Sequence, residues 1–96
     1  MTKSIMPFNR KGHCYTCGAN CKTDVHHVFQ GSNRSAATKY GLLVDLCRVC
    51  HERAHRHPKE FEETHHLKTR AQCVAMNHYH WDISTWRELF RKDYRS

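Results

Sequence analysis

The chain has 96 residues, of which 39% are hydrophobic, and 16 Lys and Arg against 9 Asp and Glu give it a formal net charge of +7. A domain of this size buries only about 60 to 65% of the surface of its unfolded chain, so its core is small and a bound metal would help to hold it together. The composition excludes a membrane span, which needs roughly 18 to 20 apolar residues in a row, and the positive charge favours a polyanionic partner such as nucleic acid.

The first residues predict a flexible basic leader over 1–12, which could contact DNA, followed by a zinc knuckle. The leader has no apolar segment or cleavage site of a secretory signal, so we expect the protein to stay in a reducing cytoplasm, where disulfides are rare. Cys14 and Cys17 form a C-x-x-C pair, and Gly18 behind them suits a positive φ angle. Cys21 lies four residues beyond Cys17 and is expected to stay outside the pair.

The middle of the chain predicts two strands and two helices. Residues 24–29, DVHHVF, are typical of a strand, and residues 42–46, LLVDL, are typical of a second one. Between them, residues 33–40 favour a short helix that Gly41 can cap. Residues 48–56 contain no Gly or Pro, so we expect a helix there that ends before the proline that follows.

The last third of the chain predicts helices that pack on this core. Residues 59–76 favour one longer helix, because apolar residues recur in it at helical spacing. That stripe consists of Phe61, Leu67, Ala71 and Val74. Thr85-x-x-Glu88 resembles a capping box that opens a final helix. Trp81 and Trp86 are expected to pack in the core or between helices.

Four cysteines in two C-x-x-C pairs, about thirty residues apart, predict a structural zinc site. The pairs are Cys14 with Cys17 and Cys47 with Cys50, and each can supply two corners of a tetrahedron. Such a zinc contributes on the order of 10 kcal/mol to folding, which is more than a small core supplies. Unligated buried cysteines and disulfides are the weaker alternatives.

The segment from Cys47 to His51 also matches C-x-x-C-H, the attachment sequence of a c-type haem. Haem attachment normally requires export, for which the chain carries no signal. The other C-x-x-C pair is followed by Gly18 rather than by a histidine. Zinc is therefore favoured over haem.

Four histidines around these pairs could form a second site. His51 and His55 are four residues apart on the expected helix, so they share one face and could hold a divalent ion, although a solvated helix face is the commoner reason for such a pair. His26 and His27 are adjacent on a strand and point to opposite faces. One of them could therefore complete the metal site, while the other stays free to accept a proton.

The stretch HHVFQGSNRSAATKYGLLVDLCRVCHERAH, which runs from His26 to His55, resembles the HNH nucleases of the ββα-metal group, and above all small phage-encoded members. The order of HHVF, Gly, Arg, KYGL and LC-x-x-CH carries the resemblance, which extends back to Cys14, and the closing FRKDY echoes the same members. The resemblance implies an α+β fold. Its parts would be a zinc-stabilised ββα-metal (treble-clef/HNH) core over 13–58 and a helical extension over 59–96 that packs on it.

By this resemblance the protein is a DNA endonuclease that hydrolyses phosphodiester bonds. His27 matches the general base, whereas His26, His51 and His55 match the ligands of a catalytic divalent ion, and the four cysteines match the zinc of many members. Three imidazole ligands favour Mn²⁺, Ni²⁺, Co²⁺ or Zn²⁺ over Mg²⁺. The host would be a bacterium, with the protein encoded by a phage.

The expected partner is DNA, contacted mainly through its phosphates, with low sequence specificity or nicking as the outcome. No membrane partner is expected, and a second copy or another phage protein could take part. The residues expected to contact the phosphate backbone are Arg34, Lys39, Arg48, Arg53 and Arg56.

One position departs from the family pattern. The middle Asn of the family, which orients the loop behind the base, would stand at Leu42, and the nearest asparagine is Asn33. Without this Asn, the loop behind His27 lacks the side chain that orients it in the family. A second hypothesis therefore stays open, in which the protein is a non-catalytic zinc module that binds DNA or protein. The four histidines favour the enzyme, because a zinc scaffold alone does not need them.

Overall fold

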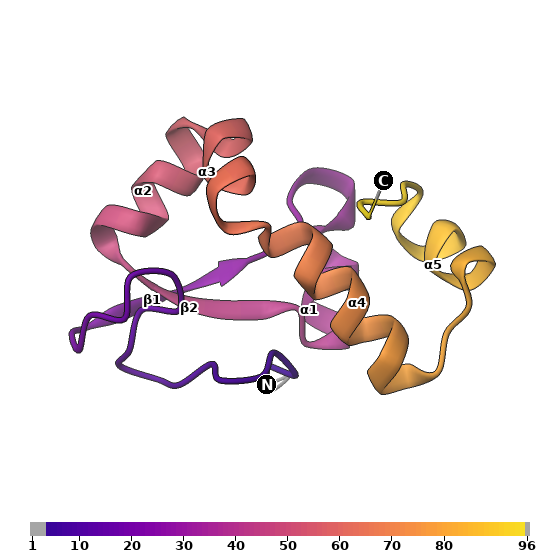
Figure 1. Ribbon diagram of the computed structural model, residues 1–96, viewed down its shortest axis with the longest axis horizontal. Coiled ribbons are helices and arrows are strands. Elements are labelled where there is room, and N and C mark those ends of the chain that lie inside the picture. The colour runs from indigo at the N-terminus through magenta and orange to yellow at the C-terminus, as the bar shows by residue number, and fades with distance from the viewer. Residues whose placement is uncertain (1–3, 96) are drawn as a thin grey trace.

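A computed structural model describes residues 4–95 and shows an α+β fold in which one pair of strands packs against helices and against the N-terminal segment (Figure 1). In chain order the elements are β1 (Thr23–His27), a 3₁₀ turn η1 (Gly31–Asn33), α1 (Arg34–Tyr40), β2 (Leu43–Cys47), α2 (Arg48–Arg56), α3 (Pro58–His65), α4 (Leu67–Tyr79) and α5 (Ile83–Phe90). None of the helices within residues 4–95 has the length and apolar character needed to span a membrane.

The two strands pair antiparallel, with His26 opposite Val44 and His27 opposite Leu43. Side chains alternate between two faces in such a pair. In β1, His26 is only 5% exposed, whereas its neighbour Val25 is 55% exposed. The two predicted strands are confirmed with slightly shifted ends, and the pairing places one histidine of the pair in the interior.

The helix before β2 and the helix after it agree with the sequence prediction. Gly41 ends α1 with a φ of 76°, a left-handed conformation that costs glycine little. Helix α2 covers Arg48–Arg56 as expected. Pro58 occupies the first position of α3, where the N–H group that proline lacks would have no partner within the helix. The short connection turns the chain sharply between α2 and α3.

The single helix predicted over residues 59–76 is wrong, because the chain breaks it at His66. This residue adopts a left-handed φ of 52° between α3 and α4, and the carboxylate of Glu62 accepts a hydrogen bond of 2.8 Å from the N–H of Lys68. On one continuous helix, Phe61 and Leu67 would point roughly 120° apart. The break allows both to be buried, with exposures of 7% and 3%.

The capping box predicted at Thr85-x-x-Glu88 is also wrong, because α5 starts earlier. Asp82 is the N-cap, and its carboxylate accepts a hydrogen bond of 2.8 Å from the N–H of Thr85. The earlier start places Trp86 in the middle of the helix, where it is fully buried.

An aromatic cluster joins α5 to the strand pair. The ring of Phe29, just beyond β1, lies 5.6 Å from that of Trp86 and 5.0 Å from that of Phe90, between ring centroids. Such pairs add about 0.5–1.5 kcal/mol each to the burial of the rings. Trp86 is therefore a core residue, while Trp81 is half-buried and stacks on Tyr79.

The expected flexible leader differs from the structure over residues 4–12, since this segment lies against β2. Met6 is buried at 4% exposure, and the side-chain oxygen of Asn9 accepts a hydrogen bond of 2.8 Å from the N–H of Asp45. The rest of the predicted leader, residues 1–3, lies outside the described residues. Figure 1 shows the N-terminal segment running beside β2, where it covers an otherwise unpaired strand edge.

The break at His66 leads to a stability prediction. Replacing His66 with Gly should raise the free energy of unfolding of the zinc-loaded protein by about 0.5–1 kcal/mol, because glycine adopts the left-handed conformation with less strain. Urea unfolding followed by circular dichroism measures it. His78→Gly, inside α4, is the control and should lower stability by about 1 kcal/mol; a loss at both positions would contradict the assigned break.

Candidate metal centres

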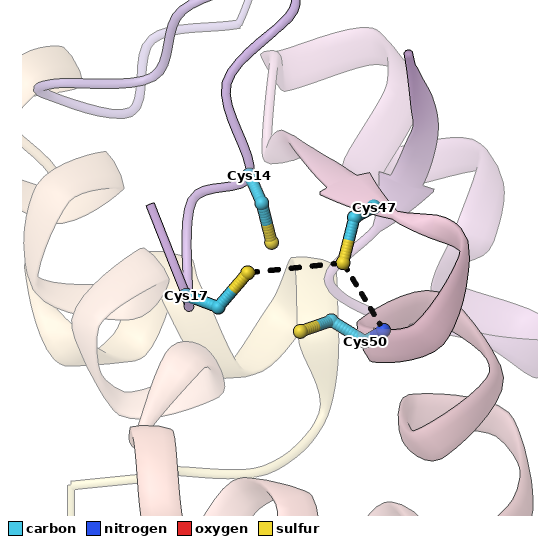
Figure 2. A group of neighbouring side chains, drawn as sticks. All are labelled: Cys14, Cys17, Cys47 and Cys50. Atoms are coloured by element: carbon cyan, nitrogen blue, oxygen red, sulfur yellow. Dashed lines mark hydrogen bonds between the residues drawn. The ribbon is translucent and has the colours of Figure 1, made fainter. Parts of the chain in front are cut away.

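Four cysteine side chains from two distant segments converge beside the start of α2 (Figure 2). Their sulfur atoms all lie within 4.8 Å of one another, and the Sγ atoms of Cys17 and Cys47 are 3.8 Å apart. Two ligands 2.3 Å from a tetrahedral zinc are also roughly 3.8 Å apart. The cluster of Cys14, Cys17, Cys47 and Cys50 therefore has the geometry of a zinc site.

The chain folds locally so that these thiols must meet. Gly18 has a φ of 76°, as predicted, and its N–H donates to the carbonyl of Cys14, which closes the knuckle that carries the first pair. Cys47 ends β2 and is also the N-cap of α2, where its sulfur accepts from the N–H of Cys50 at 3.5 Å. Cys21 is exposed and lies outside the cluster, as the sequence predicted.

The pKa values of the cluster differ strongly from one thiol to another. Burial alone would raise the pKa of Cys14, but hydrogen bonds from Thr16 and from backbone N–H groups, including that of Cys47, lower it to about 5. Burial and the neighbouring thiols Cys47 and Cys14 raise the pKa of Cys50 to about 12. The protein thus stabilises the thiolate of Cys14 readily, and a bound cation would be needed to ionise Cys50.

Three histidines form a second cluster between β1 and α2. The candidate ligand atoms of His26, His51 and His55 lie within 4.8 Å of one another. The Nε2 atoms of His51 and His55 are 3.0 Å apart, because residues i and i+4 of a helix share one face. His26 reaches the same place from the strand, with its ring centroid 5.3 Å from that of His51.

His26 is suited to be a metal ligand by its burial. Desolvation, joined by the neighbouring His51 and His55, lowers the pKa of His26 to about 3, so the ring is neutral at physiological pH. Within residues 4–95, its buried Nδ1 has no hydrogen-bond partner. A buried polar atom in that state costs about 1–3 kcal/mol, which a bound ion could offset. The second cluster is therefore also compatible with metal binding.

Asp24 belongs to this site although the sequence analysis did not single it out. Its Oδ2 lies 3.5 Å from Nδ1 of His51 and 3.7 Å from Nε of Arg48. A carboxylate on one ring nitrogen turns the other nitrogen toward the ion. The signal was present in the alternation of the strand, since Asp24 and His26 are two residues apart and share one face.

His27 stands apart from the three-histidine cluster, as expected for adjacent residues on a strand. It is half-buried at the end of β1. Burial lowers its pKa, and electrostatic interactions with Arg34 and His51 add to the effect. His27 is therefore neutral near pH 7 and able to accept a proton.

The backbone around His27 is held without an asparagine at position 42. Leu42 is fully buried, and its carbonyl accepts a hydrogen bond of 3.1 Å from the N–H of Val28. The side-chain amide of Gln30 donates to the carbonyl of His27 itself. Asn33 instead donates to the carbonyl of Phe90 at 3.1 Å, so it anchors α5. Gln30, and not Asn33, is the side chain that fixes the backbone of His27.

The five basic residues expected to contact DNA are all exposed, but they do not share one face. Arg48 lies on the same side of α2 as His51, beside Asp24. Arg53 lies roughly 140° further round the helix and lines a surface hollow with His57 and Phe61. Lys68 of α4, which the sequence analysis missed, lines a narrow hollow together with His26.

Comparisons of the chain with models of known families, with curated proteins and with solved structures found no match. The HNH resemblance therefore stays a prediction, and the geometry of the two clusters carries the functional argument.

The cysteine cluster leads to a prediction about zinc content. Cys50→Ser should lose the bound zinc and much of the thermal stability, because three thiols bind zinc more weakly than four and the core is small. Zinc released to a colorimetric chelator and the Tm are the two measurements. Cys21→Ser is the matched control and should keep both; if Cys21→Ser loses zinc and Cys50→Ser keeps it, the ligand set is wrong.

Proposed function

We propose that the protein is a metal-dependent endonuclease that hydrolyses DNA phosphodiester bonds at the histidine cluster. The observation that carries the proposal is the convergence of His26, His51 and His55, with neutral His27 adjacent to His26 on the strand. The three imidazoles come from a strand and a helix, and the cysteine cluster lies at the start of that helix. This arrangement also matches the order of motifs on which the HNH resemblance is based. This supports the proposed HNH-type fold and role.

We propose a separate role for each residue of the site. His26, His51 and His55 would hold a divalent ion, and Asp24 would keep His51 turned toward it. Such an ion, when bound, polarises the scissile phosphate and stabilises charge on the leaving oxygen. His27 would take the proton of the attacking water, and Gln30 would keep the backbone of His27 in place.

The charge around the histidines supports a phosphate substrate. After burial, the charge of Arg34 helps to lower the pKa of His27, and Lys68 makes a smaller contribution to the low pKa of His26. Arg48 lies beside Asp24. These three cations come from three different helices and surround the proposed site. Since phosphate contacts carry no sequence information, we propose low sequence specificity or nicking.

The second candidate is a non-catalytic zinc module that binds DNA or protein. The absence of an asparagine at Leu42 favours it, whereas the buried, neutral His26 favours the enzyme. A zinc module needs the cysteine cluster alone. The number of metal ions that one chain binds therefore separates the two candidates.

The test of the proposed base is a plasmid assay. His27→Ala should cut supercoiled plasmid at least 100-fold more slowly than the unchanged protein, because removing a general base typically costs about 10²–10⁴ in rate. The assay is run with Mg²⁺, Mn²⁺, Ni²⁺, Co²⁺ and Zn²⁺ in turn, with a chelator as a blank. His78→Ala, an exposed histidine far along α4, serves as the matched control and should cut normally.

The outcomes of this assay are distinct. Near-normal cleavage by His27→Ala would contradict the assignment of His27 as the general base but would still support the proposed nuclease activity. Absence of cleavage by the unchanged protein with every ion, together with one zinc per chain, would support the zinc module instead.

The role of Asp24 is tested separately by ion affinity. Asp24→Asn should weaken Ni²⁺ binding to the zinc-loaded protein by about 10- to 100-fold, because the carboxylate that orients His51 is lost. Isothermal titration calorimetry measures the affinity. Glu52→Gln removes the same charge from the exposed side of α2 and should leave Ni²⁺ binding unchanged. Equal losses in both variants would point to net charge rather than to orientation.

A further inference from the structure

A groove leads from the histidine cluster to the C-terminal segment. One hollow is lined by His26, Gln30 and Lys68, and a second is lined by Lys68, Lys92 and Tyr94. The two hollows also share Pro58 and Glu62 and so adjoin. We call this continuous surface the Tyr94 groove.

Two ammonium groups lie against the Tyr94 ring at the far end of the Tyr94 groove. The Nζ atoms of Lys68 and Lys92 lie 5.8 Å and 5.5 Å from the centroid of the Tyr94 ring. Cation–π attraction to the ring favours the position of each ammonium group. Within residues 4–95 neither lysine forms an ion pair with a carboxylate. Both ammonium groups are therefore available to an anion that binds in this hollow.

The other charged groups in the groove leave it positive. Lys59, Glu62 and Glu63 also line the second hollow, so three lysines face two glutamates. The carboxylate of Glu62 accepts a hydrogen bond from the N–H of Lys68 at the start of α4. The two lysines over the ring are therefore the free cations nearest to Tyr94 in this groove.

The segment that carries Lys92 and Tyr94 is fixed in position by a buried polar side chain. Gln72 is fully buried in α4; its amide donates to Asp93 at 2.8 Å, and its carbonyl oxygen accepts from the N–H of Tyr94 at 2.6 Å. The hydroxyl of Thr69 donates to the carbonyl of Tyr94 at 2.8 Å. In the FRKDY motif, Phe90 thus lies in the core and Asp93 is hydrogen-bonded to Gln72, while Lys92 and Tyr94 line the groove.

We propose that the Tyr94 groove guides a DNA strand away from the histidine cluster, and that Lys68 and Lys92 each contact the DNA backbone at phosphates flanking the one that is cut. The choice of DNA rests on the proposed function, because the groove begins at His26. The contact is to phosphate rather than to a base, since the two lysines cover the ring on which a base would stack.

The experiment measures DNA binding without cleavage. The zinc-loaded protein, with no other divalent ion added, is titrated into a fluorescent duplex of about 20 base pairs at several salt concentrations, and anisotropy gives Kd. The double variant Lys68→Gln, Lys92→Gln should bind at least tenfold more weakly, and the slope of log K against log salt should fall by about 1.8, or 0.9 for each lost contact.

A second double variant controls for net charge. Lys22→Gln with Arg87→Gln removes the same two charges from exposed positions outside the groove, and it should bind nearly as tightly as the unchanged protein. Zinc content and circular dichroism check that each variant folds. Equal weakening in the two double variants, or no change in the groove variant, would overturn the proposal.

The results also separate this proposal from the proposed function. The unchanged protein could cut no DNA while the groove variant alone binds DNA more weakly and with a smaller salt dependence. That result would support DNA binding in the groove and contradict the proposed nuclease activity. If the protein cuts DNA and the groove variant binds normally, the nuclease is supported and the groove is not.

Discussion

The convergence of four thiols at the start of α2 is the constraint on which the rest of the structure depends. It ties the N-terminal knuckle to the end of β2, two segments about thirty residues apart, where the sheet has only two strands and supplies little core of its own. The same point starts α2, because the sulfur of Cys47 caps the helix. The direction of α2 then decides where His51 and His55 point.

The parts that followed local rules were predictable from the sequence. The spacing of the cysteines predicted their cluster, the lack of Gly and Pro predicted α2 with its end at about Arg56, and adjacency on a strand separated His26 from His27. The break at His66 was not predictable, because it follows from the packing of Phe61 and Leu67 into the core and runs against the helix propensity of the segment. The packing of residues 4–12 and the contact of Asp24 with His51 are likewise long-range. The nuclease activity and its HNH identity stay predictions.

The C-terminal helices have a role in the site as well as in the core. Phe29 follows directly on the strand that carries His26 and His27, and it packs on Trp86 and Phe90 of α5. The helical extension thereby supports the strand from behind, while Lys68 and Lys92 reach the groove in front of it. A chain that ended after α2 would keep all seven candidate ligands but lose these supports.

The two clusters are joined at one peptide bond, since Cys50 belongs to the first and His51 to the second. Each residue turns an α-helix by about 100°, so one residue inserted between them would leave the four thiols in place and rotate His51 and His55 away from His26. The spacing between the clusters therefore tolerates no change in length, whereas loops elsewhere in the chain can lengthen. Descendants of this sequence can vary in size at their turns but not at the step from Cys50 to His51.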